Sequence, residues 1–202
     1  MKLTHHPELH GLRRHRKGLR IRRWHYVPAV ILACLTLVAQ TTDGRTCAEK
    51  QLRFTVPAAP WTLILPGENF ELQREQYKPD GRSGYFMLTD DRSHLDVSFF
   101  IEPVGNCRDS KACRDMVWKL GNPAWGKPKN VVQSDLAGVY FVEFLVPSFE
   151  NEPIAQQNMY AEFVVDGFWV DMHISKIFYK PEEHQLFERI VKSVKFEPRK
   201  KP

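Results

Sequence analysis

The clearest alternation of apolar and polar positions in the chain lies in residues 158–176. Two alternating runs, residues 158–165 and 168–175, flank the dipeptide Asp166-Gly167. These two residues tolerate the positive φ angles that a two-residue type I′ turn requires at both central positions. The pattern therefore predicts a β-hairpin, and with it an antiparallel sheet.

A two-residue turn also fixes the register of the hairpin, because it places Val165 opposite Phe168 and pairs the strands outward from there. Side chains alternate between faces along a strand. One face is then wholly apolar and is predicted to be core: Met159, Ala161, Phe163, Val165, Phe168, Val170, Met172 and Ile174. The other face mixes aromatic, polar and acidic groups, with Glu162 opposite Asp171 and Tyr160 opposite His173.

Shorter apolar runs predict further strands, and two amphipathic segments predict helices. We expect strands at residues 51–56, 61–65, 70–77, 84–89, 95–101, 131–133 and 139–146. A helix over residues 111–120 is expected to be capped by Ser110, and a second helix to begin at Pro181. The polar stretch 147–157 is interpreted as a long loop. The predicted fold class is α+β, an antiparallel β-sheet with helices packed on it.

The N-terminal segment has the composition of an export signal. Eight Lys and Arg residues precede an apolar run of 13 residues, 27–39, which ends at a small residue. This run is shorter than the roughly 20 residues of a membrane-spanning helix. We therefore predict a signal peptide over residues 1–39, with an uncleaved anchor as the alternative, and an exported, periplasmic or secreted protein. A linker 40–50, a single domain 51–197 and a basic tail 198–202 follow.

Two other interpretations of this segment are open. Residues 31–34 resemble a lipobox, which would make Cys34 a lipidation site, but the apolar run continues beyond Cys34 and favours simple secretion. Arg22-Arg23 suggests a twin-arginine signal, although the flanking residues do not match it. Contact with a membrane is expected only through this segment, if it is uncleaved or lipidated.

The basic composition of the chain belongs to its first part. Residues 1–46 hold nine of the 29 Lys and Arg residues and two of the 24 Asp and Glu residues. The remaining 20 basic and 22 acidic residues give the domain a net charge of about −2 with neutral histidines. A nucleic-acid-binding domain needs a basic face, so we predict no nucleic-acid partner.

Cys107 and Cys113 are predicted to form a disulfide in an oxidising compartment. Six helical residues would separate their Cα atoms by about 9 Å, more than the roughly 7 Å that a disulfide spans. Cys107 must therefore precede the helix on which Cys113 lies. A redox-active pair is the alternative, although the spacing is not Cys-x-x-Cys. Cys47 is left over, either as a free thiol or as an intermolecular partner.

Glu162, Asp171, His173 and Tyr160 form the candidate polar cluster. Two carboxylates and an imidazole on one sheet face suggest a divalent-metal site, or a carboxyl group with a raised pKa that acts in acid–base chemistry. The structural interpretation, which we favour, is that a neighbouring Lys or Arg neutralises the acids while Trp169 and Val164 pack under a helix. The sequence contains no P-loop, nucleophile elbow or zinc motif, so no cofactor is predicted.

Two segments resemble the PsbP-like family, which comprises the extrinsic photosystem II subunit P and secreted bacterial relatives of unknown role. They are residues 54–66, with Phe54, Trp61 and Pro66, and residues 186–196, with Phe187 and Phe196. The resemblance spans about residues 50–197. It implies an α-β-α sandwich, an antiparallel sheet with helices on both faces, and a role in binding other proteins.

Together these observations favour an exported, non-catalytic binding or assembly-accessory protein with an unidentified protein partner. The alternative is a divalent-metal-binding domain or a hydrolase-like enzyme that uses the cluster of Glu162, Asp171 and His173.

Overall fold

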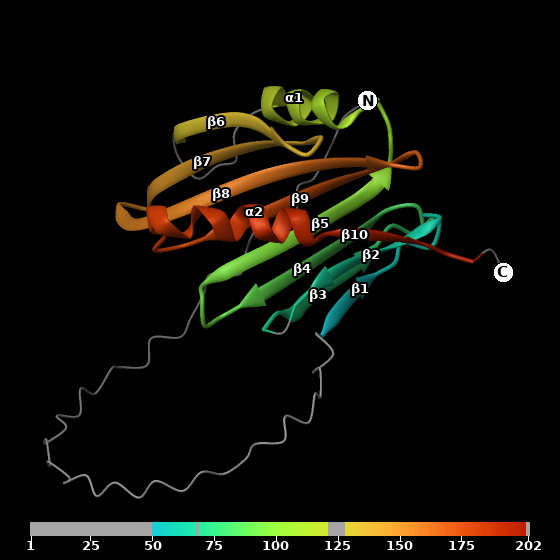
Figure 1. Ribbon diagram of the computed structural model, residues 1–202, viewed down its shortest axis with the longest axis horizontal. Coiled ribbons are helices and arrows are strands. Elements are labelled where there is room, and N and C mark those ends of the chain that lie inside the picture. The colour runs from blue at the N-terminus through green and yellow to red at the C-terminus, as the bar shows by residue number, and fades with distance from the viewer. Residues whose placement is uncertain (1–49, 68, 121–127, 201–202) are drawn as a thin grey trace, which may run out of the picture. The chain divides into compact units, whose positions relative to one another are not determined.

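A computed structural model describes residues 50–67, 69–120 and 128–200 (Figure 1). The predicted signal peptide, Cys34, Cys47 and the last two residues of the basic tail lie outside the described residues. The described strands are β1 (Gln51–Phe54), β2 (Trp61–Pro66), β3 (Glu71–Tyr77), β4 (Gly84–Asp90), β5 (Leu95–Pro103), β6 (Lys129–Leu136), β7 (Val139–Phe149), β8 (Glu152–Val165), β9 (Phe168–Lys176) and β10 (Lys195–Pro198). The described helices are α1 (Ser110–Leu120), a 3-10 turn, η1 (Pro181–Glu183), and α2 (His184–Ser193).

The strands form two antiparallel sheets. The large sheet has seven strands in the order β3-β4-β5-β9-β8-β7-β6, and the small sheet has three in the order β1-β2-β10. The predicted α+β class, an antiparallel sheet with helices packed on it, is confirmed in this form, mostly strands with two short helices (Figure 1). The small sheet was not predicted, because the apolar pattern of a strand does not reveal its partner.

The hairpin of β8 and β9 has the predicted register. Val165 lies opposite Phe168, Glu162 opposite Asp171 and Tyr160 opposite His173. Both residues of the turn have positive φ angles, 47° at Asp166 and 77° at Gly167. The sequence signal of the turn thus determines which side chains share a face.

The two faces of the hairpin contact different helices. On the inner face, the predicted core residues join side chains of β1, β2, β4 and β5 and the buried face of α2, which supplies Phe187, Ile190 and Val191. On the outer face, residues of α1, among them Met116 and Val117, pack around Trp169 and Val164. Within the described residues, no helix is long and apolar enough to cross a membrane.

The predicted loop at residues 147–157 is wrong. β7 continues to Phe149 and β8 begins at Glu152, so that the connection is the two-residue turn Glu150-Asn151, with φ angles of 49° and 70°. Pro147 lies where the register shifts between Val146 and Ser148. A bulge lets a strand continue past a residue that has no N–H to donate. For this reason β7 continues past Pro147.

The predicted cap of α1 is also corrected. The side chain of Asp109 accepts the backbone N–H of Ala112 at 2.8 Å and so takes the capping role. Ser110 instead joins the helix to the sheet. Its hydroxyl donates to the backbone carbonyl of Glu162 and accepts the N–H of Tyr140.

The two edge strands of the large sheet are irregular. β3 shows a register shift between Leu72 and Arg74, and β6 shows one between Lys129 and Val132, where Asn130 has a φ of 52°. Bulges of this kind disturb the hydrogen-bonding edge of a sheet and oppose pairing with another chain.

Candidate functional site

Two carboxyl groups are buried next to each other beneath α1. Glu162 on β8 and Asp171 on β9 are direct cross-strand neighbours on the outer face. Glu162 is fully buried, and Asp171 is 8% exposed. Cross-strand neighbours have their Cβ atoms about 5 Å apart, so the two groups interact strongly in an environment with little water.

The hydrogen bonds of this pair are incomplete. The indole N–H of Trp169 donates to Glu162 Oε2 at 2.5 Å, whereas Glu162 Oε1 and Asp171 Oδ1 have no hydrogen-bond partner. We predicted a neutralising Lys or Arg, and this is wrong for the described part of the chain, where no ion pair reaches either carboxyl group. Among the described residues, the side-chain donor to the pair is an uncharged indole.

This environment favours the protonated forms. Burial raises the pKa of Asp171 to about 7, and the nearby charge of Glu102 adds to this rise. Burial and the charge of Asp171 raise the pKa of Glu162 well above its usual value, while the bond from Trp169 acts in the opposite direction. Two buried carboxylates side by side cannot both be charged cheaply, so near neutral pH the pair holds at least one proton.

Helix α1 is attached to the sheet at this pair. Besides the bridge through Ser110, the guanidinium of Arg114 lies 5.3 Å from the ring centroid of Tyr140, the β7 neighbour of Glu162. Arg114 is buried and forms an ion pair with Asp115 at 2.6 Å. This cation is therefore engaged by its own helix and by an aromatic ring, and it makes no ion pair with Glu162.

The predicted disulfide between Cys107 and Cys113 is confirmed. The Cα atoms are 4.8 Å apart, Cys113 lies on α1 and Cys107 in the preceding segment, as the helix geometry requires. Both cysteines are buried against Trp169. The disulfide thus fixes the first turns of α1 above the residue that donates to Glu162.

His173 and Tyr160 lie on the same face but make other contacts. Their rings stack with centroids 4.2 Å apart, and His173 Nε2 is 3.1 Å from Asn158 Oδ1. Burial, with the charges of Asp171 and Glu162, raises the pKa of Tyr160. Among the described residues, no three His, Cys, Asp or Glu side chains gather as metal ligands. The structure brings the two acids together and places the imidazole against an aromatic ring.

Another buried carboxylate, outside the pair of Glu162 and Asp171, was missed by sequence reasoning. Glu143 on β7 is 4% exposed; it accepts from Gln157 Nε2 at 2.8 Å and lies 3.1 Å from His184 Nδ1. Glu143 and Gln157 belong to neighbouring strands, and their pairing includes the segment predicted as a loop. For this reason no sequence pattern indicated this contact.

The outer face of β4 and β5 carries a partly exposed aromatic patch. Tyr85 lies directly opposite Phe100, and Met87 follows Tyr85 on the same face. The guanidinium of Arg74 is 5.7 Å from the Tyr85 ring, and Lys78 Nζ is 5.6 Å from the Phe100 ring. We call these five side chains the outer-face patch. Phe100 is also the β5 neighbour of Asp171.

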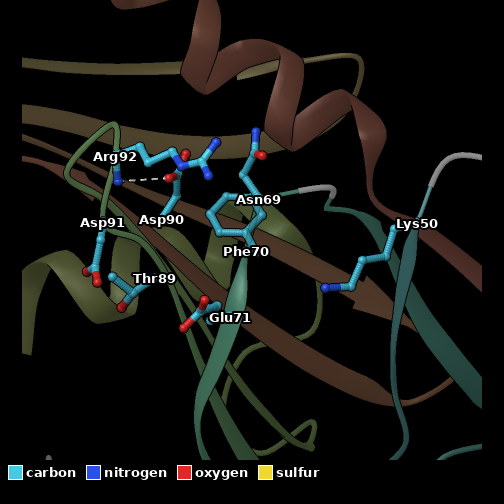
Figure 2. A pocket seen from close by; sticks show the side chains of 8 residues that line it. All are labelled: Lys50, Asn69, Phe70, Glu71, Thr89, Asp90, Asp91 and Arg92. Carbon is cyan, nitrogen blue, oxygen red and sulfur yellow. Dashed lines mark hydrogen bonds between the residues drawn. The ribbon is translucent and has the colours of Figure 1, made fainter.

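The hollows of the described surface include one at the β4–β5 turn and one beside α1. A hollow of about 240 Å³ lies between the start of β3 and the β4–β5 turn, and Figure 2 shows Lys50 and Arg92 around it together with Glu71, Asp90 and Asp91. The side chain of Asp90 is occupied by its own turn, since it accepts the N–H of Arg92 and the hydroxyl of Ser93. The other, about 710 Å³, lies beside the start of α1, between residues 108–111 and the β6–β7 turn, with Glu162 in its wall.

Comparison with known proteins finds structural likeness only. No family model and no curated protein sequence matches the chain. The solution structure of cyanobacterial PsbP from Synechocystis matches 75% of this chain and 95% of its own length, with 10% identity and a TM-score of 0.47. The crystal structure of the Ran-binding protein Mog1p from Saccharomyces cerevisiae matches 73% and 96%, with 12% identity and a TM-score of 0.42. The resemblance to PsbP-like proteins inferred from the sequence thus reappears as a structural likeness. At these scores, neither match carries information about function or site residues.

Proposed function

We propose that this chain is an exported, non-catalytic protein-binding module, and that the outer-face patch is its contact surface. The observation that carries this proposal is the composition and exposure of the patch. Tyr85, Met87 and Phe100 are only partly buried. Among the described residues, the main contacts of helix α1 with the sheet are with β7 and β8. Aromatic residues, Met and Arg are enriched at protein interfaces, where they supply most of the binding energy.

The charges around the patch indicate the kind of partner. Arg74 and Lys78 lie over the two aromatic rings, and Lys78 is 3.5 Å from Glu102, with more than half of its side chain exposed. A complementary surface presents an apolar side chain surrounded by acidic groups, since opposite potentials across an interface favour encounter and correct orientation. The partner class is therefore a protein with an acidic rim around an apolar centre.

Export is supported by two independent features. The N-terminal sequence has the parts of a signal peptide, and a disulfide is the form that cysteines take in oxidising compartments. The absence of catalysis is part of the proposal. It rests on the burial of the only paired carboxyl groups predicted from the sequence, whose unpartnered oxygens are closed to solvent.

The test is a binding experiment with the full chain and two matched variants. The immobilised protein is exposed to an extract of exported proteins, and the captured proteins are compared between the unmodified chain, Phe100→Gln and Val132→Gln. Val132 is a matched control because it is 50% exposed on β6, at the far edge of the same sheet. We expect capture to be lost with Phe100→Gln and retained with Val132→Gln.

Two results contradict the proposal. Equal capture by all three proteins removes the patch as the contact surface. Turnover of a substrate that is abolished by Glu162→Gln or Asp171→Asn shows instead that the acid pair is an active site and that the chain is an enzyme.

A further inference from the structure

The acid pair has a geometry that the proposed binding role does not explain. Glu162 and Asp171 face each other from adjacent strands, both nine-tenths or more buried, and each has an oxygen without a hydrogen-bond partner. An ionised carboxylate without a partner costs several kcal/mol when it is buried. A protonated carboxyl group avoids much of this cost, because it can donate to the neighbouring carboxylate.

No cation among the described residues compensates the pair. The strands and the helix packed around it carry these charged or titratable groups on the same face: Glu102 on β5, Tyr85 on β4, Tyr140 on β7, Tyr160 on β8, His173 on β9, and Arg114 with Asp115 on α1. Of these, Glu102 and the tyrosines do not supply positive charge. Arg114 is held by Asp115 and Tyr140, and His173 stacks on Tyr160. Of the cations farther away, Lys78 forms an ion pair with Glu102, Lys111 with Asp115 and Arg108 with Asp109, and Arg74 lies over the ring of Tyr85.

Helix α1 is linked to this pair in two ways, through the backbone of Glu162 and through Trp169. Ser110, the first residue of the helix, donates to the backbone carbonyl of Glu162 itself. Met116 and Val117 pack in the cluster of Trp169, whose indole N–H is bonded to the carboxylate of Glu162. If both acids become charged, they need water or cations. The hollow that has Glu162 in its wall lies beside the start of α1, so movement of the helix away from the sheet would widen the access of water to the pair.

We propose that Glu162 and Asp171 form a proton-binding site that couples the docking of helix α1 to pH. The helix rests on the sheet while the pair holds a proton and opens locally when the proton is lost. The disulfide between Cys107 and Cys113 keeps the start of the helix attached, so the opening concerns the rest of α1. This inference does not depend on the proposed binding function.

Hydrogen exchange of the full chain tests the proposal. We measure the opening equilibrium of α1 amides between pH 5 and 7, corrected for the intrinsic dependence of exchange on pH. When the closed state holds one proton more than the open state, opening increases about tenfold per pH unit. We expect this increase in the unmodified chain, and a flat profile in the double variant Glu162→Gln with Asp171→Asn.

The control is Asp135→Asn, which removes an exposed carboxylate from β6 of the same sheet and should keep the tenfold dependence. Amides of β5 report opening of the whole domain. If the α1 amides open only as rarely as the β5 amides at each pH, so that α1 exchanges through opening of the whole domain, or if the unmodified chain is flat, the coupling is overturned. Should the double variant not fold, infrared spectra of the unmodified chain decide. A protonated carboxyl band at pH 6 that disappears by pH 9 supports the site, and its absence at pH 6 refutes it.

Discussion

Trp169 and Glu162 are joined across the outer face of the hairpin by a bond of 2.5 Å from the indole Nε1 to Oε2. Both side chains are buried, and the donor is uncharged. A charged donor would have fixed Glu162 in its ionised form, whereas the indole bond lowers its pKa only against the larger effect of burial. The carboxyl group is therefore held in place while it remains able to take up a proton.

Replacing Trp169 by Phe should destabilise the protein by about 1–3 kcal/mol, because it removes this donor from a buried carboxyl group. The hydrogen bond from Trp169 favours the ionised form of Glu162, so the loss of stability caused by the substitution should grow as the pH rises. Denaturant unfolding at pH 5 and pH 8 measures both effects. Trp61→Phe is the control, since the indole of Trp61 donates to the backbone carbonyl of Val165. The loss of stability in this variant should not depend on pH. An equal loss at both pH values for Trp169→Phe would contradict this prediction.

The stability of the domain should fall as the pH rises from about 4 to about 7. The pKa of Asp171 rises from 3.8 to about 7 on folding, so in this window the folded state binds a proton that the unfolded state has released. The free energy of unfolding then decreases by up to about 1.4 kcal/mol per pH unit. Chemical denaturation of the unmodified chain and Asp171→Asn measures this slope. The slope should be smaller in the variant, and equal slopes would exclude Asp171 as its source.

Removing the disulfide with Cys107→Ser and Cys113→Ser should lower stability by about 2 kcal/mol, the cost expected for a short closed loop. Because both cysteines pack on Trp169, the same variant should increase the exposure of this indole to a fluorescence quencher. Calorimetry and quenching measure the two effects. Lower stability without a change in quenching would show that the disulfide does not hold α1 over Trp169.

Gly167→Ala should destabilise the hairpin by about 1 kcal/mol through backbone strain alone. The residue has a φ of 77°, and a Cβ atom there would meet no atom within 4 Å. Left-handed conformations disfavour residues that carry a Cβ. Gly105→Ala is the matched control, since it is equally open but does not have a positive φ, and it should be close to neutral. Equal thermal stability of the two variants would refute the argument.

Divalent cations should not bind at Glu162 and Asp171. Within the described chain the acids gather no third ligand, because His173 stacks on Tyr160. Titration calorimetry with calcium, manganese and zinc should show no heat that differs between the unmodified chain and Glu162→Gln. Binding that this substitution abolishes would instead establish the metal-site alternative.

The hairpin could be predicted in detail because its register follows from two residues. Once Asp166 and Gly167 form the turn, every pair outward is fixed, including the opposition of Glu162 and Asp171. The position of Cys107 before the helix of Cys113 followed from helix geometry in the same local way. Predictions succeeded where a short stretch of chain contains all the information that the structure uses.

Predictions failed where the outcome depends on distant partners. Trp169 was predicted to pack under a helix, but its role as the donor that replaces a cation follows only from the rotamers of both side chains. Likewise β2 pairs with β10 rather than with the large sheet, and the strand pattern of residues 61–65 is the same for either arrangement. Pro147 suggests the start of a loop, because no sequence pattern indicates the bulge that lies opposite it in β8.

The register shifts in β3 and β6 limit how another protein can bind to the large sheet. A partner that adds a strand to a sheet needs a regular edge strand with evenly spaced free N–H and C=O groups. Neither β3 nor β6 provides such an edge. A partner of the large sheet is therefore expected to bind through side chains on a face of the sheet rather than by strand addition at β3 or β6. By the same argument, the irregular edges of the large sheet oppose edge-to-edge pairing of copies of the chain into filaments.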